Sequence, residues 1–255
     1  MTAWARLTWQ AADPAALAAD LEHRLGASAQ AHEMLAGVRV LRLGDTDLEL
    51  VPWRREASDD EPHAGGRLVF EPVELLAGID DAAGASAGDT GAGGDDRVPD
   101  GGDAIRATPV IRLAGVGWAT VELDRAEAEL DPWLAPPEVR GDGAEPHLGA
   151  RTRMRPSQGL PGRVLVLAEP LTEGRLAASL ARDGEGPCVL YLEPAEGLQA
   201  WLAAAVLRGV GVSAIRSGPL GPSVILTGVP SGPHLVVVAH PGVSSPISAG
   251  GTIAP

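Results

Sequence analysis

The chain has 255 residues, with 34 acidic side chains against 20 basic ones and a formal net charge of −14. All 20 basic residues are arginine, which excludes mechanisms that need a Schiff-base lysine or a phosphate-loop lysine. The single cysteine, Cys188, excludes an internal disulfide and a cysteine-based metal cluster. The acidic balance argues against a nucleic-acid partner, because no basic cluster could follow a phosphate backbone.

The hydrophobic content of 45% is sufficient for a packed core, and the length fits one large domain or two small ones. No apolar stretch reaches the roughly 18 residues of a membrane span, and the first residues contain no long apolar run. We therefore expect a cytoplasmic protein that does not bind membranes. The bias towards Ala, Gly, Arg and Pro without lysine indicates GC-rich, bacterial coding.

The first predicted region, residues 1–79, starts with a strand, a helix and a hairpin. The run ARLTWQ at 5–10 has the β-branched and aromatic residues typical of a strand. Asp13 is placed to cap a helix that Gly26 ends, and leucines every four residues give that helix one apolar face. Residues 38–53 alternate around a Gly-Asp-Thr turn, which predicts two antiparallel strands.

An extra strand and a linker follow. The run GRLVFEPVELL at 66–76 predicts a strand without a repeat unit of its own. Residues 80–108 are rich in Asp and Gly and cannot bury enough apolar surface to fold, so we predict a flexible linker there. This stretch lacks the alternating ligands of a calcium loop. We also predict a flexible tail over 242–255.

Two further stretches within 109–241 repeat the order of elements seen in the first region. The first has a strand and helix start over 117–130 and strands near 149–155 and 163–170. The second has a strand at 187–194, then a helix and a C-terminal hairpin that lie over 195–209 and 223–239. Each stretch is a βαβββ unit, which predicts an α+β protein built from copies of one supersecondary unit.

This repeat resembles the vicinal oxygen chelate superfamily, which has the glyoxalase and bleomycin-resistance fold. The hairpin VRVLRLGDTDLELVPW and the crossover RVLVLAEPLTEGRLAASLARDGEGPCVLYLEP resemble those of methylmalonyl-CoA epimerase-like members. The resemblance implies that two βαβββ units pair into a cupped, mixed β-sheet. Substrate, and often a divalent metal, would occupy the cup.

The resemblance also implies positions for metal ligands, on the first and last strands of each unit. In this chain those positions are Arg6, Gly117 and Val189 on first strands, and Glu49, Val166 and Val237 on last strands. Only Glu49 is a plausible ligand, whereas a catalytic metal needs about three protein ligands. We therefore predict no metal and no other cofactor. Glu49 is the one candidate catalytic acid or base.

An Arg6–Glu49 ion pair could replace the metal in the first unit. The first and last strands of a unit are neighbours in this fold, and Thr8 and Gln10 would share the face of Arg6. The alternative is an ordinary cross-strand pair, worth about 0.2–1 kcal/mol. The sequence leaves the two alternatives open.

The second and third units are predicted to present an apolar cup, formed by Gly117, Ala119, Val121, Val166, Val189, Tyr191, Leu235 and Val237. Such a surface is either a filled core or a ligand pocket. Trp9 and Trp118 lie in predicted strands, where they either pack in the core or stack on an aromatic or cationic ligand. His234 lies at the start of the last strand, near the predicted rim of the cup.

These observations favour a metal-independent protein that binds or sequesters a small molecule, with a ligand set of Arg6, Thr8, Trp9, Gln10, Trp118, Tyr191 and His234. The acidic charge favours a cationic ligand, and the Trp residues favour an aromatic or cationic one. One alternative is a lyase or isomerase of the glyoxalase and epimerase kind that uses Glu49. Another is a scaffold or dimerisation module, since the first unit lacks a paired unit and would find one in a homodimer.

Overall fold

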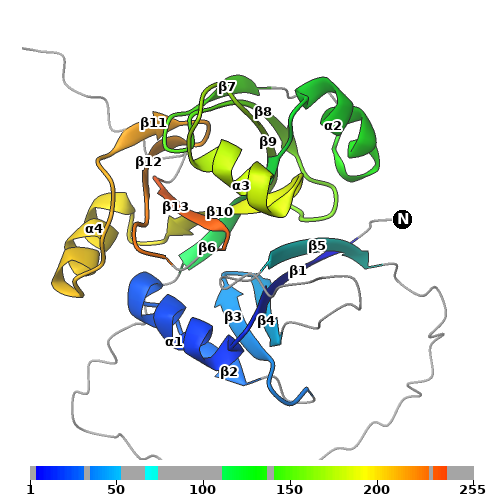
Figure 1. Cartoon of the computed structure of the whole chain (residues 1–255). Helices are drawn as coiled ribbons and strands as arrows, with labels where there is room; N and C mark the ends of the chain where they lie inside the picture. The colour runs from blue at the N-terminus through cyan, green and yellow to red at the C-terminus, as the bar shows by residue number, and fades with distance from the viewer. Residues whose placement is uncertain are drawn as a thin grey trace, which may run out of the picture.

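The structure is a computed structural model, and it describes residues 4–31, 35–52, 67–73, 111–136, 141–229 and 232–239, with backbone only at 4–6 and 70–73. The N-terminal elements are β1 (Trp4–Ala11), α1 (Pro14–Leu25), β2 (Ala29–Ala31), β3 (Arg39–Leu43), β4 (Thr46–Pro52) and β5 (Arg67–Val73). The next unit contains β6 (Ile111–Ala119), α2 (Leu123–Glu129), a 3-10 turn (Asp131–Trp133), β7 (Gly141–Glu145), β8 (Ala150–Pro156) and β9 (Val164–Pro170). The rest are α3 (Arg175–Asp183), β10 (Gly186–Pro194), α4 (Leu198–Leu207), β11 (Arg216–Gly218), β12 (Gly221–Ile225) and β13 (His234–Val238) (Figure 1).

Helix α1 forms where the sequence predicts it. The Asp13 side chain accepts hydrogen bonds from the backbone N–H groups of Ala15 and Ala16 at 3.0 and 2.9 Å. Gly26 ends the helix with a φ of 72°, a left-handed conformation that glycine adopts without a steric penalty. Leu21 and Leu25 are buried, so the predicted apolar face is the one that packs.

The described strands form two sheets, a C-terminal one of eight strands in the order β11-β12-β13-β10-β6-β9-β8-β7 and an N-terminal one of five. In the C-terminal sheet, β6 pairs parallel with β9 and β10 pairs parallel with β13, one pair in each βαβββ unit. β6 and β10 pair antiparallel and join the units. β11 lies against β7, so the sheet curls into an almost closed cup (Figure 1). This arrangement confirms the predicted α+β fold of repeated units.

The N-terminal sheet has the order β2-β3-β4-β1-β5, which repeats the order β7-β8-β9-β6-β10. β1 is parallel to β4 and antiparallel to β5, as β6 is to β9 and β10. The extra strand β5 therefore takes the place that the first strand of a paired unit would have. The homodimer, the domain boundaries and the flexible segments stay predictions, and the linker and tail lie outside the described residues.

Two hydrophobic clusters lie on opposite faces of the C-terminal sheet. The outer cluster joins this sheet to α1, α2, α4 and the N-terminal sheet, and it includes Leu7, Leu50, Leu113, Leu190 and Trp201. The cup cluster fills the concave face and consists of Ala119, Leu148, Ala150, Val166, Ala168, Leu176, Cys188, Val189, Tyr191, Ile225, Val236 and Val238. Leu176 belongs to α3, so the crossover helix packs into the cup, as Figure 1 shows.

Three residues assigned to the cup from the sequence lie elsewhere. Leu235 and Val237 belong to the outer cluster. In the register in which β13 pairs with β10, Val236 and Val238 face the cup instead. Val121 follows the end of β6 and is exposed. The other five residues assigned to the cup are buried and form a filled core, namely Gly117, Ala119, Val166, Val189 and Tyr191.

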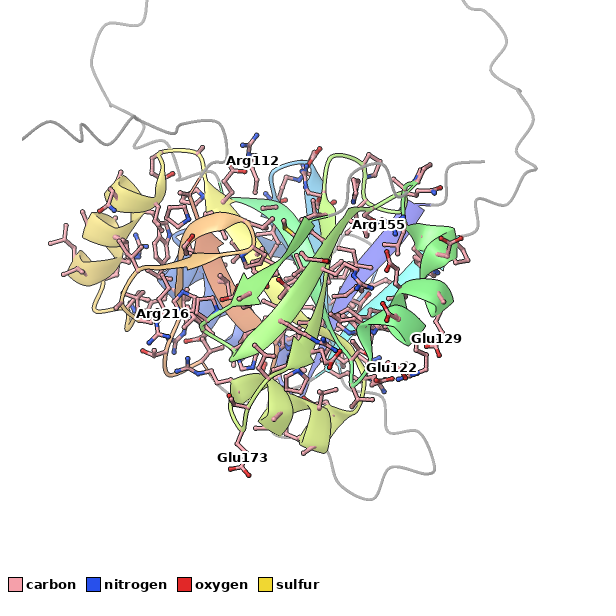
Figure 2. The ribbon with its side chains drawn as sticks, turned by 90° about the horizontal axis from the view of Figure 1, so that it is seen from above. Arg112, Glu122, Glu129, Arg155, Glu173 and Arg216 are labelled. Atoms are coloured by element: carbon pink, nitrogen blue, oxygen red, sulfur yellow. The ribbon has the colours of Figure 1, made fainter. Side chains whose placement is uncertain are left out.

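Ion pairs hold α2 against the outer side of the C-terminal sheet. Arg153 on β8 contacts the carboxylates of Asp124 and Glu127 at 2.6 and 2.7 Å. Figure 2 shows Glu122 and Glu129 at the surface beside α2. Among the described residues, no helix is long and apolar enough to cross a membrane.

The close approach of β6 and β10 predicts a large cost for a side chain at Gly117. A Cβ atom there would lie 2.6 Å from Val189 Cβ, which a well-packed sheet cannot relieve by a side-chain rotation. We expect Gly117→Ala to lower the free energy of unfolding by about 2 kcal/mol, measured by urea denaturation. The matched control is Gly143→Ala on β7, where the nearest atom would be Thr152 Oγ1 at 3.4 Å and no comparable loss is expected. Equal losses in both variants would contradict the packing argument.

Candidate functional site

Four residues lie at one level across the concave face of the cup, where the resemblance places metal ligands. Gly117 pairs with Val166 on β9 and with Val189 on β10, and Val189 pairs with His234 on β13. The metal-ligand position on the last strand, which was assigned to Val237 from the sequence, is therefore occupied by His234. The sequence alone did not reveal this register.

This level of the cup does not fit a divalent metal. Gly117, Val166 and Val189 have no donor atoms in their side chains, so His234 is the single potential ligand among the four. In the described part of the chain, no group of three or more His, Cys, Asp or Glu side chains is placed to hold a metal ion.

His234 instead forms a hydrogen-bonded pair with Ser179 of α3. Its Nε2 atom lies 3.0 Å from Ser179 Oγ, and the ring also bonds to the backbone of Arg175. Burial, together with the positive charges of Arg175 and Arg182, lowers the pKa of His234 to about 4. The imidazole is therefore neutral near pH 7.

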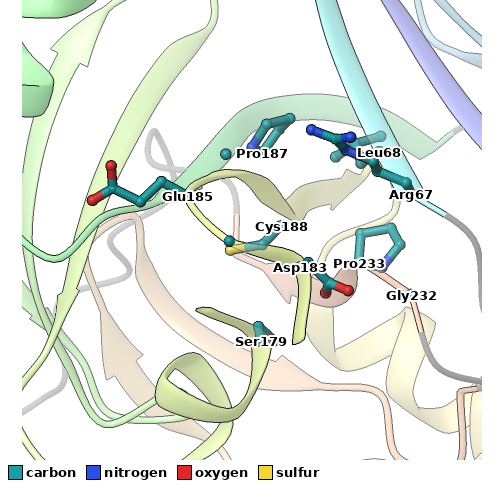
Figure 3. A pocket seen from close by; sticks show the side chains of 11 residues that line it. Arg67, Leu68, Ser179, Asp183, Glu185, Pro187, Cys188, Gly232 and Pro233 are labelled. Atoms are coloured by element: carbon teal, nitrogen blue, oxygen red, sulfur yellow. The ribbon is translucent and has the colours of Figure 1, made fainter. Parts of the chain in front are cut away.

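Ser179 lies at the base of a cleft between the two sheets. The enclosed volume is about 20 Å³, so a ligand would lie largely in the part of the cleft that is open to solvent. Its walls come from the start of β5, the end of α3, the start of β10 and the loop before β13, and include Arg67, Leu68, Asp183, Pro187, Cys188 and Pro233 (Figure 3). Burial raises the pKa of the Cys188 thiol to about 12, so this cysteine stays protonated and is a poor nucleophile.

A second polar cluster lies where the two edges of the cup meet. The Glu145 carboxylate is fully buried and accepts hydrogen bonds from the Tyr191 hydroxyl at 3.3 Å and the His147 backbone N–H at 3.1 Å. Nε2 of the His147 ring lies 3.1 Å from the Ser223 carbonyl oxygen, across the seam between the edges. Burial raises the pKa of Glu145 and lowers that of His147. A buried carboxyl group with a raised pKa beside a phenol is a combination that acid–base sites use.

The candidates of the first unit lie on a different surface. Thr8 pairs with Glu49, and Gln10 follows on the same face of the N-terminal sheet, half-buried. Arg6 is two residues before Thr8 and shares this face by strand periodicity, but its side chain lies outside the described ones. Trp9 points to the opposite face and is fully buried in the outer cluster.

The structure brings two of the predicted ligand residues near the cleft. His234 bonds to Ser179 at its base, and Trp118 pairs with Pro187, which lines it. Tyr191 lies deeper, in the cup cluster. Sequence reasoning missed Ser179 and Arg67, which no motif marks.

Comparisons with known proteins show similarity at the level of the fold. No protein-family model matches the sequence, and no curated protein matches it. A methylmalonyl-CoA epimerase structure from Mycobacterium tuberculosis is similar over 53% of this chain and 94% of its own, with 21% identity and a TM-score of 0.43. A variant of the Streptomyces coelicolor epimerase in complex with 2-nitronate-propionyl-CoA is similar over 50% of this chain and 97% of its own, with 24% identity and a TM-score of 0.40. A hypothetical protein from Bacillus halodurans C-125 is similar over 51% of this chain and 96% of its own, with 16% identity and a TM-score of 0.40.

The buried charge of Glu145 predicts a variant that is more stable than the natural protein. Because its folded-state pKa is raised, ionisation at neutral pH opposes folding, and the penalty disappears at acid pH where the group is protonated. Glu145→Gln keeps an acceptor for Tyr191 and removes the charge. We expect a higher urea midpoint than the natural protein at pH 7.5 and similar midpoints at pH 4. A lower midpoint at pH 7.5 would show that the charge contributes to stability.

The pKa of His234 predicts a loss of stability in acid. Because the unfolded chain takes up this proton near pH 6.5 and the folded protein only near pH 4, stability falls as the pH drops through that interval. The full loss is about 3 kcal/mol. We expect His234→Gln to remove this part of the pH dependence, measured by urea denaturation between pH 7 and pH 4. Parallel curves for the two proteins would contradict the assignment.

Proposed function

We propose that the protein binds a small molecule in the cleft between the two sheets, without a resident metal. The observation that carries the proposal is the Ser179–His234 pair at the base of this cleft. Binding sites of this kind combine mostly apolar walls with a few fixed polar groups that orient the ligand. Here α3 and β13 fix the polar pair, and Leu68, Pro187 and Pro233 supply apolar walls.

The hydrogen bond between Ser179 Oγ and His234 Nε2 fixes the hydroxyl at the base of the cleft, where it can meet a polar group of the ligand. Leu68 and the two prolines provide apolar contacts that suit an aromatic ring. The acidic charge of the whole chain attracts cations at long range, whereas groups in the cleft determine what is held.

A second candidate function is acid–base catalysis at Glu145 and Tyr191. The observation that favours it is the raised pKa of Glu145, which burial causes. A carboxyl group with a raised pKa keeps its proton to higher pH and can act as a general acid. The cup cluster packs around Tyr191, so this function requires α3 to move and admit the substrate. Glu49 remains the candidate base on the N-terminal sheet.

Binding is tested by nuclear magnetic resonance with benzyl alcohol as the probe. The chain has six Trp residues, and Trp118 is the neighbour of Pro187 in the cleft wall. We expect benzyl alcohol to shift the indole N–H signal of Trp118, with the same dissociation constant in the presence of EDTA.

The variant Ser179→Leu fills the base of the cleft, and Ala178→Leu is the matched control on the exposed side of the same helix. Binding should be lost in the first and retained in the second. Equal binding in both variants would place the ligand elsewhere, and binding that EDTA abolishes would refute a metal-independent site.

A further inference from the structure

The charges that line the cleft are not balanced, although the whole chain is strongly acidic. Glu185 and Asp183 provide the negative charges, and Arg67 provides the positive one. Asp183 pairs with Arg182, and Glu185 pairs with Arg125, and neither arginine lines the cleft. The resulting local charge determines which ligand the cleft can hold.

Glu185 is held by groups at the start of α2. Its two carboxylate oxygens lie 2.6 and 2.5 Å from the Arg125 guanidinium. It also accepts hydrogen bonds from the Thr120 hydroxyl and the Val121 backbone N–H at 2.9 and 2.7 Å. Figure 3 shows its side chain pointing away from Ser179 and Pro233. These bonds hold the pKa of Glu185 below its usual range, so its carboxylate stays ionised and bound to Arg125. Arg125 also contacts Glu122 and Glu129.

Asp183 is neutralised by its neighbour in the sequence. The Arg182 guanidinium contacts both Asp183 carboxylate oxygens, with Nε–Oδ1 at 2.9 Å and Nη2–Oδ2 at 2.7 Å. This two-point geometry is the arrangement in which an arginine and a carboxylate bind most strongly. Asp183 therefore adds little net charge to the cleft.

Among the described residues that line the cleft, Arg67 is the charged side chain without an ion pair. It is exposed at the start of β5, and no other described residue forms an ion pair with it. Figure 3 shows its guanidinium at the wall of the cleft, directed towards Pro187. Arg67 is therefore the charge of the cleft that a ligand can meet directly.

From this balance of charges we propose that the cleft takes a small organic carboxylate, with the carboxylate on Arg67 and the apolar body against Leu68, Pro187 and Pro233. The guanidinium fork matches a carboxylate through two parallel hydrogen bonds. This inference rests on the proposed binding function and specifies the ligand class. It replaces the expectation of a cationic ligand, which depended on the charge of the whole chain. Arg67 belongs to the N-terminal sheet, so both sheets contribute to the site.

The experiment compares three probes that share one ring, namely benzoate, benzyl alcohol and benzylammonium, by the Trp118 indole signal and by calorimetry. We expect benzoate to bind most tightly, and more weakly as sodium chloride is raised. Arg67→Gln should weaken benzoate binding about tenfold and change benzyl alcohol binding by less than about twofold. Arg67→Glu should make benzylammonium the tightest probe. Arg42→Gln, at an exposed arginine of β3 paired with Asp47, is the matched control and should bind as the natural protein does.

The outcomes separate this inference from the proposed function. Equal affinity for benzoate and benzyl alcohol, unchanged in Arg67→Gln, would overturn the carboxylate assignment and leave small-molecule binding in place. Tightest binding of benzylammonium by the natural protein would overturn it in favour of a cationic ligand. If none of the three probes binds, both the inference and the proposed function fail.

Discussion

The antiparallel pairing of β6 and β10 is the contact on which the C-terminal sheet depends. It joins two βαβββ units into one sheet, and each unit alone would leave its apolar concave face in water. Gly117 allows this contact, because Val189 occupies the space that a Cβ atom would need. The curl of the sheet around this pair brings β7 and β11 together. The buried cluster of Glu145, His147 and Tyr191 follows from that closure.

The position of α3 distinguishes this cup from a cup that holds a ligand in its centre, because here the helix occupies the centre. Leu176 and Ser179 of α3 pack against the concave face, and His234 is the one polar side chain among the four residues at the level where metal ligands were expected. The polar groups of the cup form two clusters. One group, around Ser179 and His234, borders the cleft, and the other lies at the seam between β7 and β11.

The N-terminal sheet extends this arrangement beyond a pair of units. Its β5 strand takes the place of a partner's first strand, and its leucines complete the outer cluster with α1, α4 and the convex face of the C-terminal sheet. This packing also brings Arg67 to the cleft. The acidic chain thereby acquires a local positive charge, and local charge governs binding because solvent screens distant charges within about 10 Å.

The sequence by itself determined the units and their elements. The Asp13 cap, the Gly26 stop and the alternation over 38–53 are local signals, and the structure retains them. The short edge strands β2 and β7 carry weak local signals, and sequence reasoning missed them. Tertiary structure decided the strand register, and the register places His234 rather than Val237 towards the cup. Alternation along a strand separates its two faces, but only pairing with a neighbouring strand determines which face points to the cup. Tertiary structure also decided the site, since Ser179 meets His234 across 55 residues through packing that no local pattern encodes.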